Sequence, residues 1–180
     1  MAQGIRKIGI VGAGQMGSGI AHVCALAGIP VVLNDIASQR MKDALATING
    51  NMARQVSKKR ITEEQKAAAL KLISTVETYD GLNDCDLVIE AATEKEEVKR
   101  KIFHELCAVL KPEAIVASDT SSISTSSGEG SSRFRRRPES MRCHARGGVG
   151  ERAIGRVFQV SSGMSLAMAA QASWRQQPVM

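Results

Sequence analysis

The stretch KIGIVGAGQMG, residues 7–17, decides the fold that we expect for this chain. Its first five residues form a short apolar run, which is typical of a strand buried on both faces of a parallel sheet. The next six have the spacing G-x-G-x-x-G, and apolar residues then recur at helical spacing as far as Gly28, a C-cap candidate. The stretch therefore predicts a strand, a glycine turn and a helix.

A glycine turn in this context predicts a dinucleotide site. Gly12 permits the tight turn, Gly14 lets the backbone approach a pyrophosphate, and Gly17 allows close packing of the helix on the strand. The N-terminus of the helix presents free N–H groups and the positive end of its dipole to the phosphates. The residues that we expect to bind the cofactor here are Gly12, Ala13, Gly14, Gln15, Met16 and Gly17.

Asp35 ends the second expected strand, residues 30–35, about 20 residues beyond the glycines. A carboxylate at this place can hydrogen-bond the ribose hydroxyls of adenosine and would repel a 2′-phosphate. No arginine follows directly to favour NADP, so the sequence favours NAD as the cofactor. The alternative is a solvated aspartate at the end of a strand.

Strand-like and helix-like segments continue to alternate, which is typical of a doubly wound parallel sheet. Thr62-Glu63-Glu64-Gln65 has the spacing of a capping box and begins the second of two paired helices. We therefore expect an α/β fold, a Rossmann-type domain over residues 1–124 with an inserted helical pair. The remaining expected elements are helices at 38–59, 62–72 and 96–110, and strands at 73–76, 87–91 and 114–118.

Charged residues gather after the strand at 87–91. Glu90 and Glu94 stand at a strand end, where open α/β sheets bind ligands, and could orient a cofactor ribose or cap the next helix. Lys99, one helical turn further on, could reach the same place or belong to a solvated helix face.

The composition changes near residue 125. Residues 1–125 carry 15 Lys and Arg against 15 Asp and Glu, so residues 126–180 hold the whole net charge of +6. All nine basic residues of that segment are Arg, and Gly and Ser fill much of the rest. We expect residues 125–180 to be an irregular, disordered or aberrant tail, with strand-like character only at 153–160 and weak helical character at 164–174. A basic arm for nucleic acid or another polyanion is the less favoured alternative.

The sequence lacks the features that would indicate a membrane protein, a secreted protein or a metal site. No apolar run approaches the roughly 20 residues of a membrane span, and the N-terminus lacks a signal-peptide core, so we expect a cytoplasmic protein with no membrane partner. The four cysteines include no Cys-x-x-Cys pair, and we expect reduced thiols and no metal site.

Several motifs in order resemble the NAD-binding domain of 3-hydroxyacyl-CoA dehydrogenases, and within that family the bacterial 3-hydroxybutyryl-CoA dehydrogenases. They are VGAGQMGSGIA at 11–21, Asn34-Asp35, the helical pair, VIEAATE at 88–94 and SDTSS at 118–122. The resemblance implies NAD-dependent, reversible oxidation of a 3-hydroxyacyl-CoA to the 3-ketoacyl-CoA. It also implies that Glu94 and Lys99 lie near the nicotinamide half of NAD, that Lys58 approaches the CoA, and that Ser121 hydrogen-bonds the substrate.

The sequence departs from the family after SDTSS. The family has Asn where this chain has Asp119, and further on it has a His-Phe-x-Asn-Pro motif whose histidine is the general base. His144 stands near the corresponding position without matching neighbours, and is the candidate base. The sequence predicts a truncated dehydrogenase without the family's C-terminal domain, which carries the homodimer interface. The tail is then an out-of-frame continuation.

Two other functions stay open. One is an NAD-binding remnant without turnover, which could bind a polyanion through its basic arm. The other is a hydroxyacid dehydrogenase of the phosphogluconate type, which shares the glycine turn but is disfavoured by the helical pair and by the Glu-Ala-Ala-Thr-Glu segment.

Overall fold

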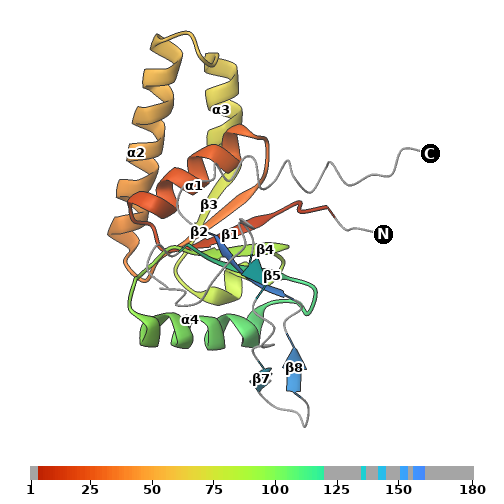
Figure 1. The fold of residues 1–180 in the computed structure, drawn as a ribbon. Helices are drawn as coiled ribbons and strands as arrows, with labels where there is room; N and C mark the ends of the chain where they lie inside the picture. Colours follow the sequence, from red (N-terminus) through yellow and green to blue (C-terminus); the bar gives the residue numbers. More distant parts are fainter. Residues whose placement is uncertain (1–3, 120–134, 137–141, 145–150, 154–155, 161–180) are drawn as a thin grey trace, which may run out of the picture.

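A computed structural model describes residues 4–119, 135–136, 142–144, 151–153 and 156–160 of the chain. Strands and helices alternate along the first part, as the sequence predicts (Figure 1). The strands there are β1 (Ile8–Val11), β2 (Val31–Asn34), β3 (Ile73–Val76), β4 (Leu87–Glu90) and β5 (Ile115–Asp119). The helices are α1 (Gln15–Leu26), α2 (Ser38–Ser57), α3 (Glu63–Lys71), the 3-10 turn η1 (Tyr79–Leu82) and α4 (Glu96–Val109).

These five strands form a parallel sheet in the order β3-β2-β1-β4-β5. The chain moves outward from β1 to β3 on one side and then returns to place β4 on the other side of β1. The order therefore reverses between β1 and β4, and ligands of open α/β sheets bind beyond the carboxyl ends of the strands at such a point. The predicted doubly wound α/β fold is confirmed.

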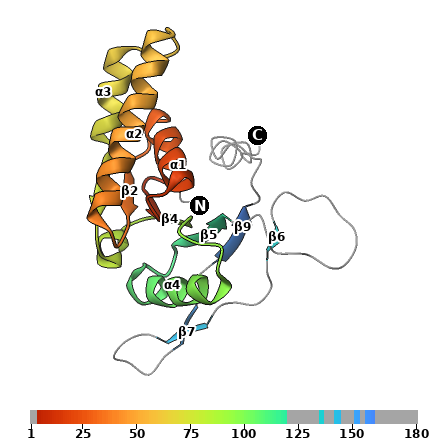
Figure 2. The same cartoon turned by 90° about the vertical axis from the view of Figure 1, so that its left-hand side faces the viewer.

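Helices cover both faces of this sheet (Figures 1 and 2). Successive strand residues point to opposite faces, so Ile8 and Ile10 pack under α1, α2 and α3, whereas Val11 packs on the side of α4. The α4 side chains Ile102, Phe103 and Leu106 belong to the second cluster. Burial on both faces explains why these strands read as continuous apolar runs.

The inserted pair, α2 and α3, forms a hairpin that extends away from the sheet (Figures 1 and 2). The predicted capping box is confirmed: Gln65 N–H donates to Thr62 Oγ1 at 3.2 Å, and Thr62 N–H donates to Gln65 Oε1 at 2.9 Å. Lys59 follows α2 with a φ of 55°, and the N–H of Arg60 donates to Gln55 O. Helix α2 therefore ends in a Schellman motif with lysine at the left-handed position.

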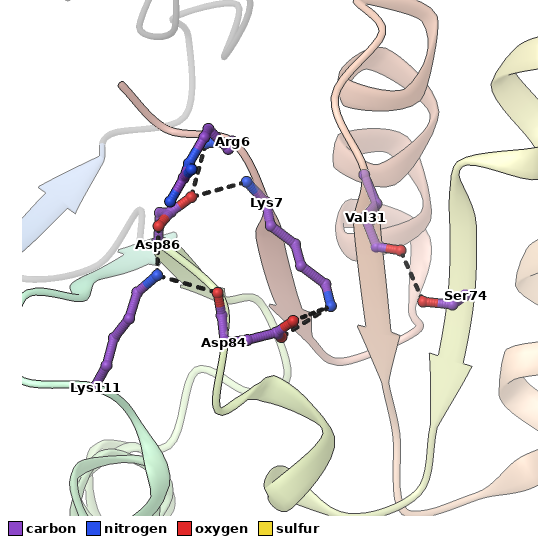
Figure 3. Close-up of polar contacts among 7 residues, drawn as sticks. All are labelled: Arg6, Lys7, Val31, Ser74, Asp84, Asp86 and Lys111. Atoms are coloured by element: carbon purple, nitrogen blue, oxygen red, sulfur yellow. Dashed lines mark hydrogen bonds and ion pairs between the residues drawn. The ribbon is translucent and has the colours of Figure 1, made fainter. Parts of the chain in front are cut away.

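The amino ends of the strands are tied together by charged residues (Figure 3). Asp86 Oδ2 accepts the backbone N–H groups of Arg6, at 2.8 Å, and Lys7, at 3.0 Å, and its Oδ1 is paired with Lys111 Nζ. Lys7 Nζ also pairs with Asp84 at 2.7 Å. This network joins the segment before β1 to the segments before β4 and β5, at the edge opposite the expected ligand site.

Four short strands are described beyond residue 125. β9 (Arg156–Val160) pairs in parallel with β5, and β6 (Arg135–Arg136) pairs antiparallel with β9. β7 (Arg142–His144) pairs antiparallel with β8 (Glu151–Ala153). The strand-like character expected at 153–160 corresponds to β9, but the expectation that it is confined to that segment is wrong, because β6, β7 and β8 are strands as well. The weak helix expected at 164–174 lies outside the described residues.

The described residues also bear on the expectations about membrane-spanning helices and about the cysteines. None of their helices combines the length and apolar character that crossing a membrane requires. Cys24 and Cys85 are free and buried, and burial raises the pKa of each thiol to about 11. Cys107 is disulfide-bonded, so the expectation of a reduced thiol is wrong for that residue.

Candidate dinucleotide site

The three glycines of the turn differ in what surrounds them. Gly12 has a φ of 104°, and a Cβ there would lie 2.6 Å from the Cα of Ala92. A Cβ on Gly17 would lie 1.8 Å from the carbonyl oxygen of Gly12. The fold therefore explains both glycines, as the sequence predicts for a tight turn and for close helix packing. A Cβ on Gly14 would meet no atom within 4 Å, so the protein's own packing does not explain that glycine.

The first turn of α1 is suited to an anion. Gly14 is the N-cap residue, no side chain caps this end of the helix, and its first turn holds no acidic residue. Gln15 and Met16 are exposed there, and the first backbone N–H groups of a helix have no partner within it. The contrast with α3 is informative, because Thr62 caps that helix and Glu63 and Glu64 occupy its first turn.

Asp35 connects the glycine turn to the end of β2. Its Oδ2 accepts the backbone N–H of Ala13 at 2.9 Å, and its Oδ1 accepts that of Ala37 at 3.0 Å. The residue is only 6% exposed, so the alternative of a solvated strand-end aspartate is wrong. Each carboxylate oxygen still has a second lone pair, which leaves capacity to accept a ribose hydroxyl.

Glu90 and Lys99 form a buried ion pair on the other side of β1. Lys99 Nζ lies 2.7 Å from Glu90 Oε2 and donates to Ser118 Oγ at 3.0 Å. Ser118 Oγ in turn donates to Glu90 Oε2 at 2.8 Å. Lys99 is 6% exposed, so the solvated helix face that the sequence left open is wrong for this residue.

Sequence reasoning missed two residues at this edge. The sequence indicates Ser118 only as part of a strand end, yet it lies opposite Glu90 in the register of β4 and β5. A signal for Ser118 is present in the sequence. Two neighbouring apolar strands each carry a polar residue at the carboxyl end, Glu90 on one and Ser118 on the other. Ile36, directly after Asp35, is 87% exposed and carries no polar group, so only its solvent exposure marks it.

The other expected site residues are more scattered. Glu94 is exposed in the segment between β4 and α4. Lys58 is exposed at the C-cap of α2, at the far end of the hairpin. His144 lies in β7, and the β7–β8 ribbon lies on the outer side of α4, away from the sheet (Figures 1 and 2). Ser121 lies outside the described residues, and the described part of the chain holds no cluster of His, Cys, Asp or Glu that could bind a metal.

The strand order, the glycine turn that abuts Ala92 and the uncapped N-terminus of α1 define a Rossmann-type dinucleotide-binding domain. Residues 7–143 match the family described as "3-hydroxyacyl-CoA dehydrogenase, NAD binding domain", and the chain belongs to this family. NAD is accordingly the cofactor of the domain.

Comparison with individual proteins leads to the same family. The chain is 72% identical over 124 residues to a 3-hydroxybutyryl-CoA dehydrogenase of Bradyrhizobium diazoefficiens, a match that covers 69% of this chain and 42% of that protein. The crystal structure of (S)-3-hydroxybutyryl-CoA dehydrogenase from Ralstonia eutropha superposes with a TM-score of 0.65 at 44% identity, covering 67% of this chain and 42% of that one. The Escherichia coli 3-hydroxybutyryl-CoA dehydrogenase structure gives 0.66 at 35% identity, over 68% of this chain and 26% of that one. The chain thus spans less than half the length of these relatives.

Proposed function

We propose that the chain binds NAD across the carboxyl edge of its sheet and takes part in the reversible oxidation of a 3-hydroxyacyl-CoA, such as 3-hydroxybutyryl-CoA, to the 3-ketoacyl-CoA. The observation that carries the proposal is the open space at Gly14, where a Cβ would meet nothing in the protein. Gly19 is equally open but lies inside α1, whereas Gly14 is the N-cap at the carboxyl edge of the sheet, where the pyrophosphate of a ligand would approach the backbone. The first turn of α1 supplies N–H groups for that pyrophosphate.

Asp35 supports NAD over NADP. Its carboxylate is held by the backbone N–H groups of Ala13 and Ala37, so it stays beside the glycine turn where the adenosine ribose would bind. A 2′-phosphate would bring a second negative charge against a fixed carboxylate. Exposed Ile36, the next residue, offers an apolar surface on which the adenine could lie.

In this proposal, NAD held by the glycine turn and Asp35 would supply a hydride acceptor for the carbon that bears the 3-hydroxyl. The hydroxyl proton passes to a general base, for which His144 is the candidate, while Ser121 hydrogen-bonds the substrate oxygen. Glu94, on the exposed segment after β4, lies on the side of β1 to which the nicotinamide half would extend. Lys58, at the end of the α2–α3 hairpin, offers a positive charge to the CoA phosphates. We place this reaction in the cytoplasm.

Titration of NAD against Gly14→Ala and Gly19→Ala variants tests cofactor binding. A Cβ on either glycine meets nothing within 4 Å, and Gly19 lies inside α1, so both variants should fold. Gly14→Ala should lose NAD affinity by about tenfold or more, because the methyl group occupies the path of the pyrophosphate, whereas Gly19→Ala should bind like the original chain. Equal affinity in all three proteins would contradict the proposed site.

A second candidate is an NAD-binding module without turnover. The observation that favours it is the placement of His144 in β7, on the far side of α4 from the sheet and therefore away from Ser118. NADH formation from 3-hydroxybutyryl-CoA, measured beside a His144→Ala variant, separates the two functions. Turnover that the variant loses supports the dehydrogenase with His144 as base, while NAD binding without turnover supports the module.

The Arg-, Ser- and Gly-rich residues 125–180 bear on the same choice. We infer an out-of-frame continuation, because Lys disappears and the apolar periodicity fades beyond residue 125. Translating the coding DNA in its other two frames tests this. A His-Phe-x-Asn-Pro motif in one of them would support the inference, and its absence from both would favour a basic arm for a polyanion.

A further inference from the structure

The Glu90 carboxylate is surrounded by four hydrogen-bond donors. Its Oε1 accepts the backbone N–H groups of Ala92, at 3.0 Å, and Thr93, at 3.3 Å. Its Oε2 accepts Lys99 Nζ at 2.7 Å and Ser118 Oγ at 2.8 Å. Glu90 is fully buried, and the donors supply the hydrogen bonds and the opposite charge that a buried carboxylate needs.

An ion pair in this place is poorly accounted for by stability alone. Removing both charges from water costs several kcal/mol, and apolar residues of similar size often give an equal or more stable fold. The core on the same face of the sheet offers such packing, since Val88 on β4 and Val116 on β5 are both buried among apolar side chains. A fully hydrogen-bonded polar network instead specifies one arrangement of the elements that it joins.

The elements joined here are those that border the expected nicotinamide side of the site. Glu90 ends β4, Ser118 lies opposite it near the end of β5, and Lys99 comes from the first turn of α4. The two amides held by Glu90 belong to the loop after β4, and Ala92 of that loop lies against Gly12 of the glycine turn. The dinucleotide of a doubly wound sheet runs from the adenosine side, here Asp35 on β2, across β1 to this side.

We propose that Glu90, Lys99 and Ser118 form a positioning network that holds the loop after β4 and the exit of β5 in the geometry that receives the nicotinamide half of NAD. Lys99 acts on the cofactor through Glu90 and Ser118, as a positioning residue. This inference rests on the proposed NAD site. It predicts that damage to the network weakens binding of the whole dinucleotide and spares ligands that occupy only the adenosine and phosphate side.

Paired titrations with NAD and ADP test the network, because ADP carries the adenosine and two phosphates without the nicotinamide riboside. Ser118→Ala removes one hydroxyl and leaves the Lys99 ammonium and its ion pair in place. Lys99→Met removes the charge, Lys99→Arg retains it, and Lys101→Met is the matched control, an exposed lysine on the same helix. We expect about tenfold weaker NAD binding in Ser118→Ala and Lys99→Met, ADP binding within about twofold, recovery in Lys99→Arg, and no change in Lys101→Met.

Three results would overturn the inference. The first is unchanged NAD affinity in Ser118→Ala together with a loss in Lys99→Met, which would indicate direct contact of Lys99 with the cofactor. The second is a parallel loss of NAD and ADP, which would indicate a general structural role. The third is unchanged NAD affinity in every variant. If Lys99→Met does not fold, Ser118→Ala decides alone, and failure of the unsubstituted chain to bind either ligand would refute the proposed NAD site itself.

Discussion

The backbone N–H of Ala13 donates to the Asp35 carboxylate across 2.9 Å, so the residue that follows β2 also holds the turn that follows β1. A single side chain thereby fixes the distance between the expected ribose and pyrophosphate positions. The same carboxylate accepts the N–H of Ala37 at the start of α2, which places the inserted hairpin relative to the site.

Replacing Asp35 with alanine should weaken NAD binding and narrow the preference for NAD over NADP. The variant loses the ribose acceptor and leaves the Ala13 and Ala37 amides without their partner, so we expect about a 10- to 100-fold loss in NAD affinity. Calorimetric titration with both cofactors measures the change. Asp43→Ala, an exposed carboxylate on α2, is the control and should behave like the original chain.

Replacing Gly17 with alanine should destabilise the domain severely. The new methyl group would lie 1.8 Å from the carbonyl oxygen of Gly12, which is backbone and cannot move aside cheaply. We expect a loss of about 3 kcal/mol or more in the free energy of unfolding, measured by urea denaturation. Gly19→Ala, two residues further along the same helix, should instead stabilise it by about 0.5–1 kcal/mol. Similar unfolding curves for the two variants would contradict this account of the turn.

Replacing Lys59 with glycine should stabilise the hairpin. Lys59 occupies the left-handed position of the Schellman motif after α2, where a side chain costs about 1 kcal/mol. The corresponding residue after α1 is already a glycine, Gly28, with a φ of 80°. Thermal unfolding should show a higher midpoint for Lys59→Gly, whereas Lys58→Gly, at a φ of −86°, should show a lower one.

The Asp86 network should make stability depend on pH in acid. Partial burial raises the pKa of the Asp86 carboxyl, but hydrogen bonds from Lys111 and from the amides of Arg6 and Lys7 outweigh this, so its pKa lies below the usual range. Because the folded pKa is the lower one, the unfolded chain binds more protons in acid. The contribution of Asp86 is therefore complete above about pH 4 and is lost as the pH falls through the folded pKa.

Asp86→Ala should lower the free energy of unfolding by about 1–3 kcal/mol at pH 7, and the difference from the original chain should shrink in strong acid. Urea denaturation at several pH values measures both. Asp84→Ala is the matched comparison, because the Asp84 side chain is 59% exposed and its pair with Lys7 should contribute only about 0.2–1 kcal/mol. If the difference in the free energy of unfolding between Asp86→Ala and the original chain stays constant down to about pH 2, the lowered pKa assigned to Asp86 is contradicted.

Local features of the sequence were enough to predict the elements of the domain. Ile73–Val76 was predicted with the bounds that the structure has, and α2, α3 and α4 were predicted to within two residues at each end. Helical spacing, a capping box and apolar runs are short-range signals, so they can be recognised without knowledge of the fold. The 3-10 turn at Tyr79–Leu82 was missed, because it is a single turn with no periodic pattern.

Only part of the site was predicted, because some of its residues have short-range signals and others depend on contacts between distant segments. The glycine turn and Asp35 were predicted because each has a role that depends on its own strand end. Lys99 was assigned to the neighbourhood of the cofactor with a solvated face as the alternative, and its burial against Glu90 and Ser118 was not foreseen. The roles of Ser121, His144 and Lys58 stay predictions.

The sequence by itself determined the class of domain and its strand-turn-helix core, because a contiguous stretch of eleven residues, 7–17, contains the strand, the glycines and the start of the helix, and Asp35 added the preference for NAD. Only the tertiary structure decided how the distant residues meet. Ala13 and Asp35 are 22 residues apart, Lys99 and Ser118 are 19 apart, and Glu90 and Ser118 are 28 apart. Their contacts arise because parallel strands bring their carboxyl ends to one edge, and that register is set by side-chain packing across the whole sheet.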